Sequence, residues 1–380
     1  MRRTLTVTAA AAALLVSAGP LPVAGAEVAA AVAPGRWSAH DAESFWTPER
    51  MAVARPLPPV APEAAVAPGP PVVPPSPAPP GAPAPPLPVP PVPRVPRGGP
   101  AGPAGTRPET PPPSPTAPVP LPAPAPPPAG PAQPRIPAAG PGVGQDFGGL
   151  PVVGRMFLVK GGGSYFCTAS VVASPGRNLV ISAAHCLLGA DTRQVAFVPR
   201  YTRATPRPFG MFPVVRTAAG RSKIWIDQRY RTQGVNRAAA LDVAFAQVGP
   251  GPKGRRVQDV VGGNRLVTGA GFTHARVTLI GHPSTAARPR RCVNRTTKYT
   301  STDARIPGSF LRIACTGYPG GTSGGPFLLR LNDRTGTGDV VGVIGGWKTG
   351  GNTPDVSYSS SFGTDIRKLY EKAVAGAKAR

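Results

Sequence analysis

The heptapeptide Gly-Gly-Thr-Ser-Gly-Gly-Pro, residues 320–326, places one serine in a short segment with glycines on both sides. Glycines here leave the Ser323 hydroxyl exposed and let a backbone N–H point at an incoming carbonyl group. A serine hydroxyl is a weak nucleophile until a neighbouring base removes its proton. The heptapeptide therefore predicts a nucleophilic serine and requires a base elsewhere in the chain.

Residues 321–325 also satisfy the Gly-x-Ser-x-Gly pattern of α/β-hydrolases. In those enzymes the catalytic histidine follows the serine in the chain. The last histidine of this sequence is His282, which precedes Ser323. The lipase-type fold is therefore excluded, and the base must come before the serine.

Among the histidines, His185 has the most unusual context, Val-Ile-Ser-Ala-Ala-His-Cys at residues 180–186. A chain order of His, Asp, Ser then needs an aspartate between residues 185 and 323. Only Asp242 lies within an apolar run, residues 241–245, where an ionised carboxylate is costly without a strong hydrogen-bond partner. A buried His185 imidazole would supply that partner. The aspartates between residues 185 and 323 are Asp191, Asp227, Asp242, Asp259 and Asp303.

From Val152 onward, short β-branched runs alternate with turn residues, which is typical of strands. These runs are residues 155–160, 168–173, 178–182, 194–198, 241–248, 277–280, 326–331 and 339–344. One helical pattern closes the sequence over residues 364–377, with Ile366, Leu369, Tyr370 and Val374 on one face. The pattern predicts an all-β sandwich or barrel followed by one helix.

All four cysteines fall in this strand-rich part: Cys167, Cys186, Cys292 and Cys315. An even number of cysteines favours two disulfides if the chain is exported, as its N-terminus indicates below, with three pairings open. No Cys-x-x-Cys pair is present, so the spacing argues against zinc and no metal site is predicted.

Three blocks together resemble the trypsin-like (chymotrypsin-fold) serine proteases of the secreted bacterial type. Residues 182–186 match the family's Thr-Ala-Ala-His-Cys, residues 241–244 its Asp-hydrophobic-Ala block, and residues 321–326 its Gly-Asp-Ser-Gly-Gly-Pro. The blocks occur in family order, and the resemblance covers about residues 150–371. It implies two six-stranded antiparallel β-barrels with the site in the cleft between them and a closing C-terminal helix.

The resemblance also implies a role for each site residue. His185 is the general base, Asp242 orients its imidazole, and Ser323 is the nucleophile of an acyl-enzyme mechanism that uses no cofactor. The backbone N–H groups of Gly321 and Ser323 form the oxyanion hole. The implied disulfides pair Cys167 with Cys186 and Cys292 with Cys315.

The sequence departs from the family next to the serine and in the substrate pocket. Thr322 stands where many animal members have the aspartate that receives a freed N-terminal amine, so activation by that ion pair is not expected. The positions that match the pocket are Gly317, Ile344, Gly345 and Gly346. They include neither an acidic residue nor a histidine, so preference for Arg or Lys, or for Glu, is not predicted.

The N-terminus has the three parts of a secretory signal over residues 1–26: a basic start, a short apolar run and a small-x-small end at Ala26. The chain is therefore expected to be exported and extracellular, without a transmembrane segment. Residues 27–55 contain Trp37, Phe45 and Trp46, and Thr47 with Pro48 predicts a helix start. They form either a pro-segment that docks on the mature domain or a frayed leader.

Residues 56–145 hold most of the 56 prolines of the 380-residue chain. Proline favours polyproline II geometry, so this Pro- and Ala-rich stretch is predicted to be a disordered, stiff linker. The protease-like domain then comprises residues 146–380.

The chain carries 42 Lys and Arg against 17 Asp and Glu, a formal charge of +25. Such an excess suits contact with an anionic cell-wall polymer or another polyanion. The sequence thus predicts a secreted endopeptidase that acts as a monomer on protein or peptide substrates. The alternative is a catalytically silent, protease-like module that binds polyanions. No specific nucleic-acid site is predicted.

Overall fold

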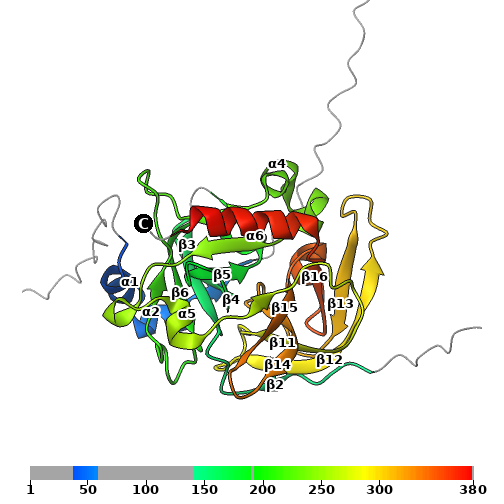
Figure 1. Ribbon diagram of the computed structural model, residues 1–380. Helices are drawn as coiled ribbons and strands as arrows, with labels where there is room; N and C mark the ends of the chain where they lie inside the picture. Colours follow the sequence, from blue (N-terminus) through cyan, green and yellow to red (C-terminus); the bar gives the residue numbers. More distant parts are fainter. Residues whose placement is uncertain (1–36, 59–139, 190–191, 379–380) are drawn as a thin grey trace, which may run out of the picture. The chain divides into compact units, whose positions relative to one another are not determined.

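The computed structural model describes residues 37–58, 140–189 and 192–378. The signal peptide expected at residues 1–26, most of the linker expected at 56–145, and Asp191 lie outside the described residues. Strands in two sheets make up most of the described elements, and one long helix, α6, closes the chain (Figure 1). The predicted all-β class is confirmed.

The first sheet forms one barrel and has the strand order β7-β6-β3-β4-β5-β9-β8, with neighbours antiparallel. Gly161 and Gly162, with φ angles of 51° and 77°, make the tight turn between β3 and β4, because both positions need the left-handed conformation. The strands are β3 Val153–Lys160, β4 Gly163–Val172, β5 Leu179–Ser182, β6 Arg193–Pro199, β7 Phe212–Pro213, β8 Ile224–Ile226 and β9 Ala244–Gln247. The two-residue strand β1 (Arg55–Pro56) pairs with β4 off this path.

The second sheet forms the other barrel and has the order β10-β15-β14-β11-β12-β13-β16, with β2 paired to β12. Its strands are β2 Gln145–Asp146, β10 Arg265–Leu266, β11 His274–Gly281, β12 Arg290–Thr300, β13 Ser309–Ala314, β14 Pro326–Asn332, β15 Thr337–Val343 and β16 Val356–Ser360. In each eight-stranded sheet, six strands are longer than two residues. The predicted pair of six-stranded modules is therefore confirmed.

One apolar core joins the two barrels. Val243 and Phe245 near β9 belong to the same buried cluster as Ile280, Leu328 and Val343 of the second sheet. Close packing of such a core resists relative displacement of its parts. Side chains placed at the junction of the barrels are therefore held in fixed positions.

Most helices are short and connect strands. They are α1 Ala39–Phe45, α2 Pro48–Val53, α3 Ala184–Leu187, α4 Gln228–Arg237, α5 Val257–Val261 and α6 Thr364–Gly376, with 3₁₀ turns η1 Ala239–Leu241, η2 Pro252–Gly254 and η3 Trp347–Gly350. The last helix buries Ile366 and Leu369 on the predicted face. Its Tyr370 packs on Phe245 and donates a 2.7 Å hydrogen bond to the Ala173 carbonyl, which fixes α6 on the first barrel.

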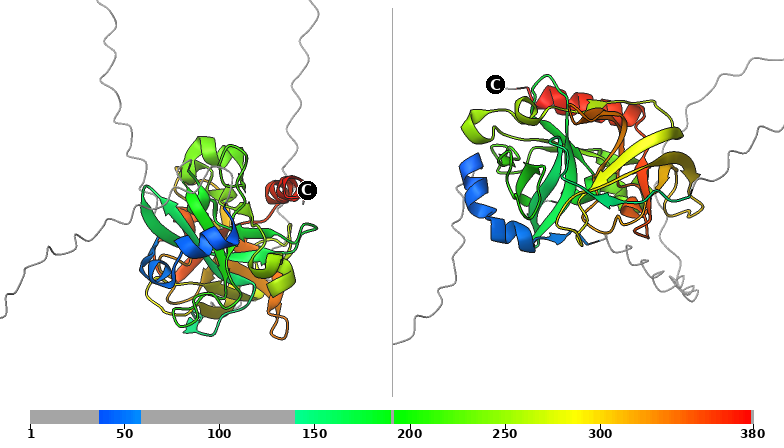
Figure 2. Two further views of the ribbon diagram at one scale, coloured as in Figure 1. Left: turned by 90° about the vertical axis from the view of Figure 1, so that its left-hand side faces the viewer. Right: turned by 90° about the horizontal axis from the view of Figure 1, so that it is seen from below.

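Residues 37–58, called the leader below, pack on the first barrel. As predicted, Thr47 caps α2: its hydroxyl accepts the Arg50 N–H at 3.2 Å, and Pro48 begins the helix. Trp46 and Met51 are fully buried in a cluster with Phe157 of β3. Burying a side chain of this size contributes about 2–3 kcal/mol. Figure 2 shows α1 and α2 along the flank of the first barrel that faces away from the second. Residues 37–58 are therefore docked on the first barrel, and their role as a pro-segment stays a prediction.

No helix in the described ranges has the length and apolar character needed to cross a membrane.

Candidate active site

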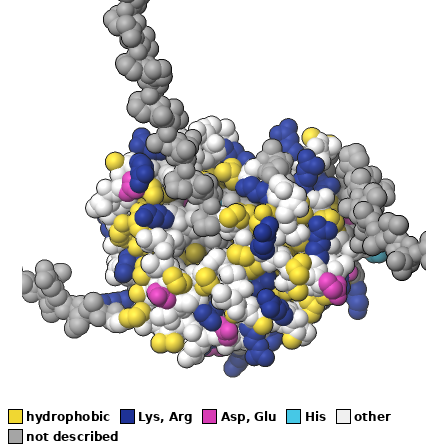
Figure 3. All heavy atoms as spheres, turned by 180° about the vertical axis from the view of Figure 1, so that it is seen from behind, with side chains coloured by type: hydrophobic (Ala, Val, Ile, Leu, Met, Phe, Trp, Pro, Cys, Tyr) yellow, Lys and Arg dark blue, Asp and Glu magenta, His cyan; other side chains and the backbone are white. Residues whose placement is uncertain are grey.

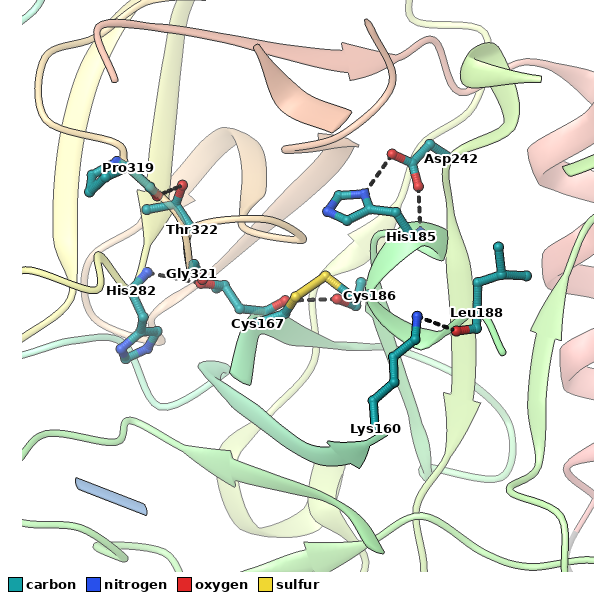
Figure 4. Close-up of a disulfide and its surroundings, with 12 residues drawn as sticks. Lys160, Cys167, His185, Cys186, Leu188, Asp242, His282, Pro319, Gly321 and Thr322 are labelled. Carbon is teal, nitrogen blue, oxygen red and sulfur yellow. Dashed lines mark hydrogen bonds and ion pairs between the residues drawn. A yellow bond between two sulfur atoms is a disulfide. The ribbon is translucent and has the colours of Figure 1, made fainter. Parts of the chain in front are cut away.

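His185 is held at the end of a buried strand. Strand β5 runs directly into α3, whose four residues Ala184–Leu187 are all buried, and the whole His185 residue is only 3% exposed. The next residue, Cys186, forms a disulfide with Cys167 of β4. The second disulfide joins Cys292 to Cys315, so both expected pairings are confirmed. Figure 4 shows the first disulfide beside the His185 loop, which it ties to β4.

Asp242 lies between η1 and β9 and faces His185 (Figure 4). Its Oδ1 accepts the His185 backbone N–H at 2.8 Å, and its Oδ2 lies 2.8 Å from His185 Nδ1. The same Oδ2 accepts the N–H of Gly346 at 2.8 Å. The expected partner of the buried carboxylate is therefore present, together with a second backbone donor that no sequence pattern indicates.

The environment of Asp242 favours its ionised form. Burial alone would raise the pKa of this carboxyl group. The adjacent His185 imidazole and the three donated hydrogen bonds outweigh burial, so the pKa of Asp242 lies below its ordinary value. A carboxylate at this place favours the tautomer of His185 with the proton on Nδ1, which leaves Nε2 free to accept a proton.

Ser323 lies in the turn between β13 and β14, and both barrels hold this turn. Its carbonyl accepts the N–H of Thr168, from β4 of the first barrel, at 2.8 Å. The next N–H, of Gly324, donates to the carbonyl of Ile344, after β15 of the second barrel, at 2.7 Å. The nucleophile candidate is therefore fixed at the junction of the barrels.

Glycines 321 and 324 are required by close packing around this turn. Both have positive φ, 94° and 81°. A Cβ atom on Gly324 would fall 2.2 Å from Ser182 Oγ and 3.0 Å from the nitrogen of Ala183. A Cβ atom on Gly321 would fall 2.5 Å from the Phe166 ring. These contacts bring the serine turn directly against the segment that carries His185.

The backbone beside Ser323 leaves two donors free. Among the residues that the structure describes, the N–H groups of Gly321 and Ser323 make no hydrogen bond. The Gly321 carbonyl, by contrast, accepts from the Thr168 hydroxyl at 2.9 Å, which fixes the orientation of that peptide. Free, oriented backbone donors beside a nucleophile can bind a developing oxyanion.

Thr322 and His282 make hydrogen bonds in and beside the serine turn. The Thr322 hydroxyl donates to the Pro319 carbonyl at 2.8 Å, within the turn itself. The His282 backbone N–H donates to the Thr168 hydroxyl at 2.8 Å. The His282 ring is fully buried, and neither nitrogen has a hydrogen-bond partner in the described part of the chain. Burial first, and Arg155 second, hold the pKa of His282 well below its usual range.

The four expected pocket residues lie in two places. The Gly317 carbonyl accepts from Arg290 at 2.8 Å, and its N–H donates to the Asp355 carboxylate at 3.1 Å. Ile344, Gly345 and Gly346 follow β15, and a Cβ atom on Gly345 would fall 2.8 Å from Asp242 Oδ2. Gly345 and Gly346 thus contact the Asp242 carboxylate, and their place in a substrate pocket stays a prediction.

An aromatic group next to these residues was missed by the sequence reasoning. Trp347 packs on Tyr358 and Tyr299, with ring centroids 4.6 Å and 5.0 Å apart. The signal that could have found it is a tryptophan directly after two glycines in the stretch that matches the pocket.

Only one group of potential metal ligands occurs within residues 37–58, 140–189 and 192–378: Cys167, His185 and Cys186. Both sulfur atoms belong to the same disulfide and are not thiolates. The group therefore does not fit a metal ion.

No known protein family matches the sequence, and no curated protein is similar to it in sequence. Solved structures do resemble the fold. The protease Anisep from Arthrobacter nicotinovorans is 22% identical, with a TM-score of 0.51 over 61% of this chain and 99% of that one. This likeness shows that the chain has the double β-barrel fold of a bacterial serine protease.

Two further structures overlap less closely. The thermostable serine protease AL20 from an extremophilic microorganism is 23% identical, with a TM-score of 0.49 over 59% of this chain and 97% of that one. A Glu endopeptidase is 13% identical, with a TM-score of 0.43 over 63% and 98% of the two chains.

Proposed function

We propose that the protein is an exported serine endopeptidase in which His185, Asp242 and Ser323 hydrolyse peptide bonds through an acyl-enzyme. The observation that carries this proposal is the buried His185–Asp242 pair, packed against a glycine-lined serine turn with two free backbone donors. The double-barrel fold, shared with a bacterial serine protease, supports it.

The chemistry follows from these positions. His185 Nε2 takes the proton of Ser323 Oγ as that oxygen attacks the substrate carbonyl carbon. Asp242 keeps the other ring proton on Nδ1 and stabilises the imidazolium that forms. The Gly321 and Ser323 N–H groups bind the tetrahedral oxyanion, a contribution of about 3–4 kcal/mol per donor.

The collapse of the intermediate expels the amine, which receives the proton from His185 and leaves Ser323 acylated. Water then attacks the ester by the same route, with His185 again as base, and regenerates the serine. No step uses a metal ion or a cofactor. We infer that the protein acts as a monomer.

Export is part of the proposal. Two disulfides suit an oxidising compartment outside the cytosol. They agree with the secretory signal expected at residues 1–26. We infer that the protein acts outside the cell on protein or peptide substrates.

Labelling with a fluorophosphonate tests the nucleophile. We expect the folded protein to be labelled at Ser323, and Ser323→Ala to abolish the label. The control Ser309→Ala removes a hydroxyl on β13 that bonds the Thr300 hydroxyl at 3.0 Å, and it should keep full labelling. Absence of label from the folded protein would favour a silent module.

A second candidate function, polyanion binding, rests on a basic surface. Figure 3 shows Lys and Arg side chains spread over one face, with fewer acidic ones. A hollow beside α3 and β6 is lined by Arg193, Arg216, Arg221 and Arg231, with no acidic residue among its described lining. Four arginines around one hollow suit an anionic polymer such as a cell-wall polyanion.

Retention on an anionic column tests this second candidate. We expect a salt-dependent retention that falls in Arg216→Ala/Arg221→Ala. Retention unchanged in this variant would assign binding to other parts of the surface. Ser323, His185 and Asp242 are not among the described residues that line the hollow, so polyanion contact and catalysis can coexist.

A further inference from the structure

The end of the leader reaches the serine turn. Strand β1 runs parallel to β4, with Arg55 opposite Tyr165 and Pro56 opposite Phe166. The next N–H, of Leu57, points to the Phe166 carbonyl at 3.4 Å. Pro56 also packs on the turn before Ser323, because a Cβ atom on Gly320 would fall 3.2 Å from Pro56 Cβ.

Leu57 and Ser323 bond the same edge of β4. Residues two apart on a strand point their N–H and C=O groups to the same edge. Phe166 accepts from Leu57 on this edge, and Thr168 donates to Ser323. At about 3.3 Å per residue, the two attachment points are about 7 Å apart, the length of two residues of an extended peptide.

This edge lies on the opposite side of Ser323 from the expected pocket. The turn is bonded to β4 through Ser323 and to Ile344 through Gly324. A peptide whose acyl half lies along residues 344–346 must therefore pass its other half, the leaving group, along β4. The backbone of residues 55–58 lies where that half would run.

Buried anchors hold the leader in this position. The indole N–H of Trp37 donates to the Val195 carbonyl at 2.9 Å, and that of Trp46 donates to the Gln194 carbonyl at 2.6 Å. The Arg50 guanidinium stacks on Phe45, 3.7 Å from the ring centre, and its Nε donates to Ser164 at 3.2 Å. Figure 2 shows the chain running from these helices along the lower side of the first barrel toward the middle of the molecule.

We propose that residues 55–58 occupy the leaving-group side of the cleft. The docked leader then excludes peptides that extend beyond the scissile bond, but it leaves Ser323 and the acyl side open. The full chain hydrolyses substrates with a small leaving group and cleaves extended peptides only after the leader lifts. This inference rests on the proposed function.

Two substrates with the same acyl half test it. One is a peptide p-nitroanilide selected from a set that varies the residue before the scissile bond. The other continues that peptide by four residues in place of the nitroanilide. Both are assayed with the full chain and with a variant in which residues 55–58 are replaced by Gly-Ser-Gly-Ser, which leaves α1 and α2 intact.

We expect the replacement to raise kcat/KM for the extended peptide by about tenfold or more, because a site occupied nine-tenths of the time loses that factor in apparent affinity. Hydrolysis of the nitroanilide should change less than about twofold, because the acyl side is open in both proteins. Trp46→Ala, which weakens the leader's buried anchor, should act in the same direction. Val53→Ala is the matched control, because Val53 is 74% exposed.

The full chain, the Gly-Ser-Gly-Ser variant and Trp46→Ala could cleave the extended peptide equally while all three hydrolyse the nitroanilide. That result would overturn the blocking role of the leader but not the proposed function. A full chain that hydrolyses neither substrate and takes no fluorophosphonate would overturn the proposed function and this inference with it. Nitroanilide hydrolysis by each variant also reports that it has folded.

Discussion

Asp242 of the first barrel accepts, on its Oδ2 atom, the backbone N–H of Gly346 from the second barrel at 2.8 Å. The other carboxylate oxygen takes the His185 N–H. Both oxygens therefore need to be acceptors, and the carboxylate cannot rotate without leaving one backbone donor unpaired. The imidazole of His185 is oriented by a group that both barrels hold.

Asp242→Asn should reduce kcat by about 10⁴, because an amide donates at one atom and selects the wrong imidazole tautomer. It should also destabilise the fold by about 1–3 kcal/mol, because its NH₂ group faces the N–H of His185 or Gly346. Steady-state kinetics and thermal unfolding measure both effects. Asp259→Asn changes an exposed aspartate paired with Arg177 and serves as control; an equal loss in both variants would contradict the role of Asp242.

Gly345→Ala should lower kcat/KM by about 10² although residue 345 carries no reactive group. Its Cβ atom would fall 2.8 Å from Asp242 Oδ2 and 3.2 Å from Cγ, so the carboxylate must move, and a shift of about 1 Å is worth that factor. Gly363→Ala, with no atom within 4 Å of the added Cβ, is the matched control. Wild-type kinetics in Gly345→Ala would show that the carboxylate tolerates displacement.

Ser323→Ala should lower turnover by about 10⁴–10⁶. Its unfolding temperature should match that of the parent, because the turn is held through the backbone of Ser323, whose carbonyl accepts the Thr168 N–H. Peptide hydrolysis and calorimetry on the same sample test the loss of turnover and the unchanged unfolding temperature. Undiminished peptidase activity would remove Ser323 from the mechanism.

His282→Phe should reduce the loss of stability in acid. The folded protein keeps His282 neutral because burial lowers its pKa well below 6.5, whereas the unfolded chain protonates near 6.5. Below pH 6.5 the unfolded state binds the extra proton, so this residue costs up to about 1.4 kcal/mol per pH unit as the pH falls. The neighbouring Arg155 adds to this effect, since its pKa, lowered by burial to about 10, leaves it charged.

Unfolding free energies at pH 7 and pH 5 measure this difference. The parent should lose more stability than His282→Phe over this interval. His40→Gln, a change at an exposed position, should follow the parent. An identical pH dependence in parent and His282→Phe would show that another group controls acid unfolding.

The sequence predicts the His185 loop, the serine turn and the strands whose β-branched runs lie between turn residues, because each has a local pattern. It does not predict β13, although Phe310, Leu311 and Ile313 of that strand are buried. It does not predict β12, which contains residues such as Asn294, Arg295 and Lys298 and has few buried side chains. It also misses β16, where Ser359 and Ser360 are buried. Their hydroxyls bond backbone groups, including the Val343 N–H and the Ala239 carbonyl, so partners distant in sequence make a polar strand a core strand.

The same limit applies to the site. The choice of Asp242 follows from the cost of burying a charge in an apolar run, and the structure places the carboxylate beside His185. The Gly346 donor carries no side chain and leaves no pattern in the sequence. The docking of the leader depends on Phe157 of β3 and on Ala196 and Val198 of β6, which come together only after the first barrel has formed.

The bond from Gly346 to Asp242 has a consequence for the order in which the protein matures. A chain whose barrels have each formed but have not yet joined lacks one of the backbone donors to Asp242 and has a serine turn with only one of its two attachments. On the proposed mechanism, the catalytic geometry is therefore complete only once the two barrels have joined.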